Sequence, residues 1–291
     1  MHKHALLAII GGGNMGRAIA LGALDAKLLA PGEIVICEPD APKRATMAGW
    51  GVQVVGKGAE ALERLLPVPG RLAEIETSMA LAACGGQVLL AVKPQSLVAV
   101  AAELQPGLAA MPRVVVSILA GMPTEKIAEA LGTACPVIRV MPNTPARLRK
   151  SMTAMCLGAG AKPPHSGLAY DLFASIGEVV KIDESLMDAF TALSGSGPAY
   201  VFYLAEAMVR AAQEVGFDRI TADRVVRQTI GGAAALLADS HEPPEALRAA
   251  VTSKGGTTEA AVGELDRARV MDAVVAAIVA GRDRGRELAR P

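Results

Sequence analysis

The spacing of apolar residues changes character about two thirds of the way along the chain. Up to about residue 183, short apolar runs of strand length alternate with stretches that have helical spacing. The runs lie at 5–10, 33–37, 52–55, 88–92, 113–118, 136–140, 152–157 and 178–182. This alternation is typical of an α/β domain, in which helices cover a mostly parallel sheet.

Beyond residue 183 the strand pattern gives way to alanine-rich helical patterns. We expect helices at 198–216, 221–239, 243–250, 257–265 and 267–287. The pattern therefore predicts two domains, an α/β domain at 1–183 and an all-α domain at 184–291.

One link between strands is unusually long. Segment 57–87 contains two helical patterns, at 60–66 and 75–83, which are separated by Pro67-Val68-Pro69-Gly70. We expect this segment to be a helical excursion on the surface and not a separate domain.

Composition narrows the class of protein. Hydrophobic residues make up 52% of the chain and aromatic residues only 3%, so the core must be mainly aliphatic. The 29 basic and 29 acidic residues cancel, which argues against a nucleic-acid-binding surface. Mean hydropathy is +0.36, yet no apolar run approaches the roughly 18 residues that span a bilayer. The first apolar run ends after six residues in Gly-Gly-Gly, unlike a signal peptide.

The four cysteines, Cys37, Cys84, Cys135 and Cys156, form no C-x-x-C pair. We interpret them as free, buried thiols in a reducing compartment. Together with the composition, they predict a cytoplasmic protein without a membrane segment.

A glycine-rich turn follows the first apolar run. Gly11, Gly13 and Gly16 have the spacing G-x-G-x-x-G, and a helical pattern begins directly after them. In a strand–turn–helix context this motif indicates dinucleotide binding: the first glycine permits the turn, the second lets the backbone approach a pyrophosphate, and the third allows close packing.

A second glycine turn lies at Val251-Thr252-Ser253-Lys254-Gly255-Gly256-Thr257-Thr258, just before a helical pattern. The first N–H groups of a helix are unpaired and carry the positive end of its dipole. Such a turn suits a small carboxylate, with a threonine hydroxyl adding a directional contact. An ordinary helix cap is the alternative.

Several polar or proline-containing segments follow predicted strands. Glu38, Lys93-Pro94-Gln95, Leu119-Ala120-Gly121 and Met141-Pro142-Asn143-Thr144-Pro145 each come directly after one. In a parallel sheet ligands collect at the carboxyl ends of strands, so we expect these segments to line one crevice.

Six stretches together resemble the pyrroline-5-carboxylate reductase family. They are GGGNMGRAI, AVKPQ, SILAG, RVMPNTPA, LSGSGPAYVF and VTSKGGTTEAA, and the resemblance covers about residues 5–280. It implies a Rossmann-type domain followed by an all-α dimerisation domain, in a homodimer that often assembles into a decamer. The implied reaction is NADPH- or NADH-dependent reduction of 1-pyrroline-5-carboxylate to L-proline, the last step of proline biosynthesis.

The resemblance also assigns site residues. The cofactor-binding residues it implies are Gly11, Gly13, Asn14, Met15, Gly16, Val92, Lys93, Pro94, Ala120 and Asn143. The substrate-binding residues it implies are Ser196, Ser253, Gly255, Gly256, Thr257 and Thr258. Thr258 matches the catalytic hydroxyl that faces the ring nitrogen. Lys254 departs from the family, since many relatives have proline there, and the 57–87 excursion is longer than usual.

The sequence offers few other candidate catalytic residues. His2, His4, His165 and His241 lie at the terminus or in proline-rich loops, without triad spacing, and we expect surface or loop roles for them. No His, Cys, Asp or Glu residues have metal-ligand spacing, so we predict no metal site. This suits an imine reductase, because the cofactor supplies the hydride and the protein supplies position.

Two other functions stay open. A β-hydroxyacid dehydrogenase needs a lysine on a helix of its second domain, and Lys254 in the glycine turn is the only lysine there. A dinucleotide sensor without catalytic activity would not need the second glycine turn, which is intact in this chain.

Glu38 bears on the choice of cofactor. It lies 22 residues beyond Gly16, at the spacing of the acidic residue that binds a ribose 2′-hydroxyl. We therefore expect NADH to be used at least as well as NADPH. Lys43 and Arg44 follow closely, and as cations they would favour the phosphate of NADPH instead; a solvent-facing Glu38 is the other alternative.

Finally, the helices after residue 198 are apolar on more sides than one helical layer can cover. The residues concerned include Val201, Phe202, Leu204, Met208, Val225, Val226, Ile230, Leu236, Leu237, Val274, Val275 and Ile278. This surplus predicts an obligate dimer through the second domain.

Overall fold

The computed structural model describes residues 4–67, 85–158 and 160–288. Its contacts divide the chain into two compact units. The first comprises Met1–Gly195 with Arg282–Pro291, and the second comprises Ser196–Gly281. Residues 184–195 thus group with the first unit, whereas the sequence pattern places the domain boundary near residue 183. Each unit is described by itself.

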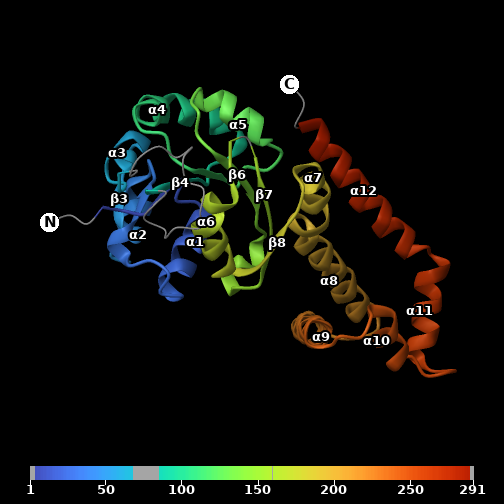
Figure 1. The fold of residues 1–291 in the computed structure, drawn as a ribbon. Helices are drawn as coiled ribbons and strands as arrows, with labels where there is room; N and C mark the ends of the chain where they lie inside the picture. Colours follow the sequence, from blue (N-terminus) through green and yellow to red (C-terminus); the bar gives the residue numbers. More distant parts are fainter. Residues whose placement is uncertain (1–3, 68–84, 159, 289–291) are drawn as a thin grey trace. The chain divides into compact units, whose positions relative to one another are not determined.

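The first unit is built on an eight-stranded sheet (Figure 1). Its strands are β1 (Leu7–Ile10), β2 (Ile34–Cys37), β3 (Gln53–Val55), β4 (Gln87–Leu90), β5 (Val115–Ser117), β6 (Val137–Met141), β7 (Ser151–Leu157) and β8 (Gly177–Lys181). The order is β3-β2-β1-β4-β5-β6-β7-β8, and the first six strands are parallel. β7 runs antiparallel to β6 and parallel to β8. All eight predicted runs are strands, which confirms the mostly parallel sheet.

Helices cover both faces of this sheet (Figure 1). One face carries α1 (Asn14–Asp25), α2 (Ala41–Ala48) and α6 (Gly167–Ala174). The other carries α3 (Gly58–Glu63), α4 (Leu97–Ala110) and α5 (Thr124–Leu131). Because side chains alternate across a strand, β1 contributes to both cores: Leu7 and Ile9 pack on the first face, and Ala8 and Ile10 on the second.

The second unit is helical, as predicted. It contains α8 (Gly197–Glu214), α9 (Arg219–Asp239), α10 (Pro244–Ala250), α11 (Thr257–Arg267) and most of α12 (Val270–Leu288). Its own buried core is small, comprising Val209, Ala222 and Val226 between α8 and α9. Of the helices that the structure describes in either unit, none has both the length and the apolar character to cross a membrane.

Two sequence expectations concern segments that the structure describes only in part. The first helix of the 57–87 excursion is α3, whose Ala61 and Leu62 are buried in the core beneath the sheet, so this helix covers the sheet and is not a surface excursion. The second helix, expected at 75–83, lies outside the described residues. Cys37, Cys135 and Cys156 are free and buried, as predicted, and Cys84 lies outside the described residues.

Candidate active site

The glycine turn between β1 and α1 has the geometry of a phosphate cradle. Gly11 has φ +111°, and a Cβ there would lie 2.6 Å from the carbonyl oxygen of Ala91. A Cβ at Gly16 would lie 2.2 Å from the carbonyl oxygen of Gly11. At Gly13, by contrast, a Cβ would meet no atom within 4 Å, and no side chain caps α1. The first N–H groups of α1 therefore begin beside open space, which fits a dinucleotide pyrophosphate.

Glu38 is folded onto this turn. It follows β2 and is only 7% exposed. Its carboxylate accepts hydrogen bonds from the backbone N–H groups of Gly12 (3.1 Å) and Asp40 (3.0 Å). The Arg44 guanidinium donates to the carbonyl oxygens of Glu38 and Pro39, at 2.8 and 2.7 Å. Glu38 therefore does not face the solvent, and Arg44 is bound to the backbone of the β2–α2 turn.

The other predicted cofactor residues follow neighbouring strands of the sheet. A Cβ at Gly11 would lie 3.0 Å from Cγ1 of Val92, which follows β4 and leads to the exposed Lys93 and to Pro94. Ala120 follows β5, and Asn143 follows β6. Since β1, β2, β4, β5 and β6 are parallel, these residues share the carboxyl edge of the sheet. The edge includes the point between β1 and β4 at which successive connections diverge, where such sheets bind ligands.

The predicted substrate turn lies in the second unit, between α10 and α11. Gly255 has φ +72°, and the N–H of Gly256 donates to the carbonyl oxygen of Ser253 at 3.0 Å. The N–H of Gly255 donates to Oε2 of Glu259 at 2.7 Å. Both glycine N–H groups are thus engaged within the turn, and the exposed Lys254 lies between Ser253 and Gly255.

Thr257 and Thr258 open α11 beyond the cap residue Gly256, which has no side chain to cap the helix. Thr258 is half-buried. Within the described part of the chain, neither its hydroxyl nor its N–H forms a hydrogen bond, and the N–H of Thr257 is also unpaired. The turn therefore offers these helix-start donors to a ligand. Ser196 similarly precedes α8, and its carbonyl oxygen accepts from Ala199 N.

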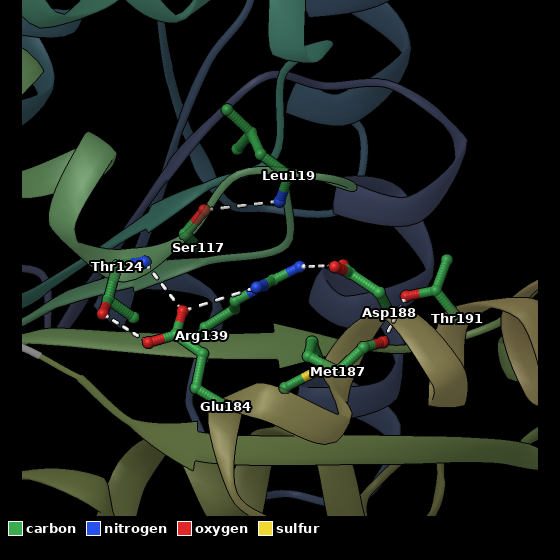
Figure 2. A network of polar contacts seen from close by, with 8 residues as sticks. All are labelled: Ser117, Leu119, Thr124, Arg139, Glu184, Met187, Asp188 and Thr191. Atoms are coloured by element: carbon green, nitrogen blue, oxygen red, sulfur yellow. Dashed lines mark hydrogen bonds and ion pairs between the residues drawn. The ribbon is translucent and has the colours of Figure 1, made fainter. Parts of the chain in front are cut away.

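The first unit contains a network of ion pairs around the buried Arg139 (Figure 2). None of its residues is among the site residues predicted from the sequence. The side chain of Arg139, in the middle of β6, is 5% exposed and pairs with Glu184 at 3.4 Å and with Asp188 at 3.2 Å. Glu184 also accepts from the N–H and hydroxyl of Thr124, at 2.8 and 2.7 Å. The one sequence feature that could have indicated this network is a single arginine within the apolar run at 136–140.

This network holds the segment that follows β8. Glu184 begins the 3₁₀ turn η7 (Glu184–Leu186), and Asp188 lies on α7 (Met187–Phe190). Met187 and Phe190 pack on side chains of β6, β7 and β8. Polar and apolar contacts together explain why residues 184–195 belong to the first unit.

His165 corrects one expectation. It is 1% exposed and therefore not a surface residue. Its Nδ1 accepts from the N–H of Lys162 at 3.0 Å, and its carbonyl oxygen accepts from Gln87 at 3.1 Å. The buried ring therefore accepts a hydrogen bond from the cap residue of the short helix before α6, which is a structural role. Among the described residues, no group of three or more His, Cys, Asp or Glu side chains could hold a metal ion.

Two family models match the chain. The model described as pyrroline-5-carboxylate reductase dimerisation matches residues 184–288. The model described as NADP oxidoreductase coenzyme F420-dependent matches residues 6–121. The first covers α7 to α12, and the second covers the glycine turn, Glu38 and the β4 edge.

Curated relatives and solved structures extend the match to the whole chain. Pyrroline-5-carboxylate reductases of Synechocystis and Pseudomonas aeruginosa are 35% and 36% identical over 285 residues each. These alignments cover 98% and 97% of this chain, and 98% and 96% of the relatives. The structure of a pyrroline-5-carboxylate reductase from Coxiella burnetii has a TM-score of 0.83 at 29% identity, covering 99% of both chains.

A pyrroline carboxylate reductase from Plasmodium falciparum, solved with NADP bound, has a TM-score of 0.81 with full coverage of both chains. At 24% identity this match supports the fold. The full-length relatives decide the family: the chain belongs to the pyrroline-5-carboxylate reductases.

Proposed function

We infer that this protein reduces 1-pyrroline-5-carboxylate to L-proline with NADPH or NADH. The observation that carries this proposal is that a chain related over its whole length to pyrroline-5-carboxylate reductases has two glycine turns without a side-chain cap. The turn before α1 suits a pyrophosphate, and the turn before α11 suits a small carboxylate.

The cofactor is held by the carboxyl edge of the sheet. The N–H groups of Gly13, Asn14 and Met15 receive the pyrophosphate, and Glu38 receives the ribose diol. The residues after β4, β5 and β6 flank the nicotinamide: Val92, Lys93, Pro94, Ala120 and Asn143. When bound, the cofactor supplies a hydride, and the protein contributes position and electrostatics.

The substrate is held by the start of α11. The N–H groups of Thr257 and Thr258 and the hydroxyl of Ser253 bind the carboxylate, since Gly255 and Gly256 use their own N–H groups inside the turn. The glycines keep the turn open, and Ser196 borders the site. The Thr258 hydroxyl faces the ring nitrogen.

The reaction joins a hydride to the imine carbon and leaves the proton of the imine on nitrogen. A pyrroline nitrogen can already carry a proton near neutral pH, so a dedicated strong acid is not required. The hydroxyl of Thr258 orients the protonated nitrogen.

NADH serves at least as well as NADPH in this proposal. The support is the position of Glu38, whose carboxylate is buried at the glycine turn and would repel a 2′-phosphate. Arg44 is engaged by two carbonyl oxygens, whereas the neighbouring Lys43 is exposed and could favour the phosphate of NADPH.

The active form is a homodimer that forms through the second unit. A groove of about 770 Å³ runs between α8 and α9. Its walls include exposed apolar side chains, among them Val201 and Phe202, which are 46% and 62% exposed. Burial of such a surface against a second copy would remove this apolar area from water. We place the protein in the cytoplasm, where buried thiols stay reduced.

The test is the oxidation of NADH and of NADPH, followed at the nicotinamide absorbance, with 1-pyrroline-5-carboxylate offered beside 3-oxo acids. Turnover of the imine with proline as product supports the proposal. Turnover of the oxo acids alone would point to a β-hydroxyacid dehydrogenase, and cofactor binding without any turnover would point to a sensor.

A further inference from the structure

Asn143 uses its side chain to bind the protein itself. Its Nδ2 donates to the carbonyl oxygen of Ser194 at 3.1 Å and to the Ser194 hydroxyl at 3.3 Å. Its Oδ1 accepts from the N–H of Met152 at 3.1 Å. Both ends of the amide are therefore engaged, in three hydrogen bonds that join the end of β6 to two other segments.

The segment that Asn143 holds is an irregular one. Ser194 lies in the π-helical turn η8 (Thr191–Gly195), and single π-turns occur frequently at functional sites. The Ser194 hydroxyl also donates to the carbonyl oxygen of Met152 at 3.5 Å. A Cβ at Gly195 would lie 3.1 Å from Cε of Met141, so this turn packs closely on the end of β6.

The hydrogen bonds between Asn143 and Ser194 bear on the proposed active site for two reasons. Asn143 follows β6 at the edge proposed to hold the nicotinamide, and Ser194 and Gly195 belong to the LSGSGP stretch that leads into α8. The Ser194 carbonyl and the Met152 N–H would each lose a partner without the amide. A shift of about 1 Å in a positioning segment can lower a rate about a hundredfold.

We propose that Asn143 is a positioning residue for hydride transfer, which acts by fixing Ser194 and Gly195 and not by binding the cofactor through its side chain. This inference rests on the proposed function. The amide of Asn143 helps to align the substrate with the nicotinamide. The glycine turn and the residues after β4 determine the affinity for the cofactor.

The test compares Asn143→Ala, Asn143→Asp and Ser194→Ala. We expect Asn143→Ala to lower kcat about ten- to a hundredfold while the Kd for the cofactor alone, measured by nicotinamide fluorescence, changes less than about threefold. Asn143→Asp keeps the oxygen that accepts from Met152 but loses the amide N–H groups that donate to Ser194. Its kcat should therefore fall about as far as that of Asn143→Ala. Ser194→Ala removes one of the three bonds of the amide and the 3.5 Å bond of the hydroxyl to Met152, but keeps the Ser194 carbonyl and Met152 N–H bonds, so it should lower kcat less than Asn143→Ala does.

The double variant Asn143→Ala/Ser194→Ala should lose less than the product of the two single losses, because Asn143→Ala has already removed the amide contact of the Ser194 hydroxyl and only its 3.5 Å bond to Met152 is left to lose. Losses that multiply would overturn the inference, as would a Kd for the cofactor that rises as much as kcat/KM falls. So would an Asn143→Ala enzyme with unchanged kcat.

A readout without substrate separates this inference from the proposed function. Hydrogen exchange measured on peptides spanning residues 191–197 should speed up in Asn143→Ala and, less, in Ser194→Ala. If the wild type proves inactive on the imine, the proposed function fails while this exchange difference still reports the attachment. Unchanged exchange in both variants would overturn the attachment itself, and Ser194→Ala keeps the test available if Asn143→Ala does not fold.

Discussion

The carboxylate of Glu38 accepts a hydrogen bond from the backbone N–H of Gly12, 3.1 Å away. This bond joins the end of β2 to the glycine turn between β1 and α1, across 26 residues of sequence. It buries a negative charge beside the N-terminus of α1, where the helix dipole favours an anion. In the proposed function, this charge lies beside the ribose of the bound dinucleotide.

Replacing Glu38 with Gln is expected to shift the cofactor preference toward NADPH. The substitution removes the charge that repels a 2′-phosphate and weakens the contact with the diol of NADH. A hydrogen bond to a charged group contributes about 1.5–3 kcal/mol, so the ratio of kcat/KM for NADPH to that for NADH should rise roughly tenfold or more. Steady-state kinetics with both cofactors measure it.

Glu38→Ser is the companion variant, since it also removes the acceptor that binds Gly12. It should shift the ratio in the same direction and lower activity with both cofactors, because the turn loses a contact. Lys43→Ser is the control for the exposed cation that follows Glu38 and should reduce activity only with NADPH. A ratio that stays constant in both Glu38 variants would show that Glu38 shapes the turn and does not contact the ribose.

Removal of the Thr258 hydroxyl should slow the reaction without affecting the cofactor. Its hydroxyl lies at the start of α11 and forms no hydrogen bond within the described chain. Thr258→Ala should lower kcat/KM for the imine on the order of ten- to a hundredfold, the effect of one well-placed polar contact. Thr258→Ser, which keeps the hydroxyl, is the matched control and should retain most activity. Equal kinetics in all three enzymes would leave Thr258 as a helix-start residue only.

Much of the fold could be predicted from the sequence because its signals are local. Leu7 and Ile9 alternate with Ala8 and Ile10 at the strand period, and the two sets pack on opposite faces. The motif from Gly11 to Gly16 describes a single turn, so it can be recognised from neighbouring residues alone. The helices of the second unit can likewise be predicted from the helical spacing of their own apolar residues.

The remainder depends on pairings between distant residues. Asn143 and Ser194 are 51 residues apart, and Arg139 and Asp188 are 49 apart. No local pattern reports such a pair, although an arginine within an apolar strand indicates that a buried partner is needed. The grouping of residues 184–195 with the first unit depends on the same long-range contacts. The burial of His165 likewise depends on packing before α6 and not on its proline-rich surroundings.

Loss of Arg139 should destabilise the first unit. Arg139→Met keeps the apolar stem of the side chain but leaves Glu184 and Asp188, which are 30% and 18% exposed, without their cation. Breaking a fully buried pair on one side costs about 3–5 kcal/mol in the free energy of unfolding. Because both carboxylates keep some contact with water, the loss should lie at or below the lower end of this range, and urea denaturation measures it. Arg149→Met, which removes an exposed pair with Asp25, is the control and should cost about 1 kcal/mol or less. Similar losses in the two variants would contradict a special role for the buried network.

The buried thiols should be unreactive in the folded protein. Burial, with smaller contributions from nearby carboxylates, raises the pKa of Cys37 to about 12 and that of Cys156 to about 11. The neutral thiols therefore favour the folded state below about pH 9, and this contribution declines as pH rises from 9 towards 11 and 12. At pH 8, iodoacetamide should label both cysteines at least roughly a hundredfold more slowly in the native protein than in urea. Peptide mass spectrometry measures each site, and equal native and denatured rates would contradict the burial.

Charge introduced into the groove between α8 and α9 should separate the subunits. Phe202 is 62% exposed in the single chain and lines this groove with Val201 and Val209. If a second copy covers it, Phe202→Asp would bury an unpaired carboxylate in an apolar interface, which costs several kcal/mol. Light scattering should then show monomers at concentrations where the wild type is a dimer, and kcat/KM should fall with the dimer population. Val98→Asp, at a site 77% exposed on α4 of the first unit, should leave the molar mass unchanged. A Phe202→Asp protein that stays dimeric, or a wild type that is active as a monomer, would refute assembly through this groove.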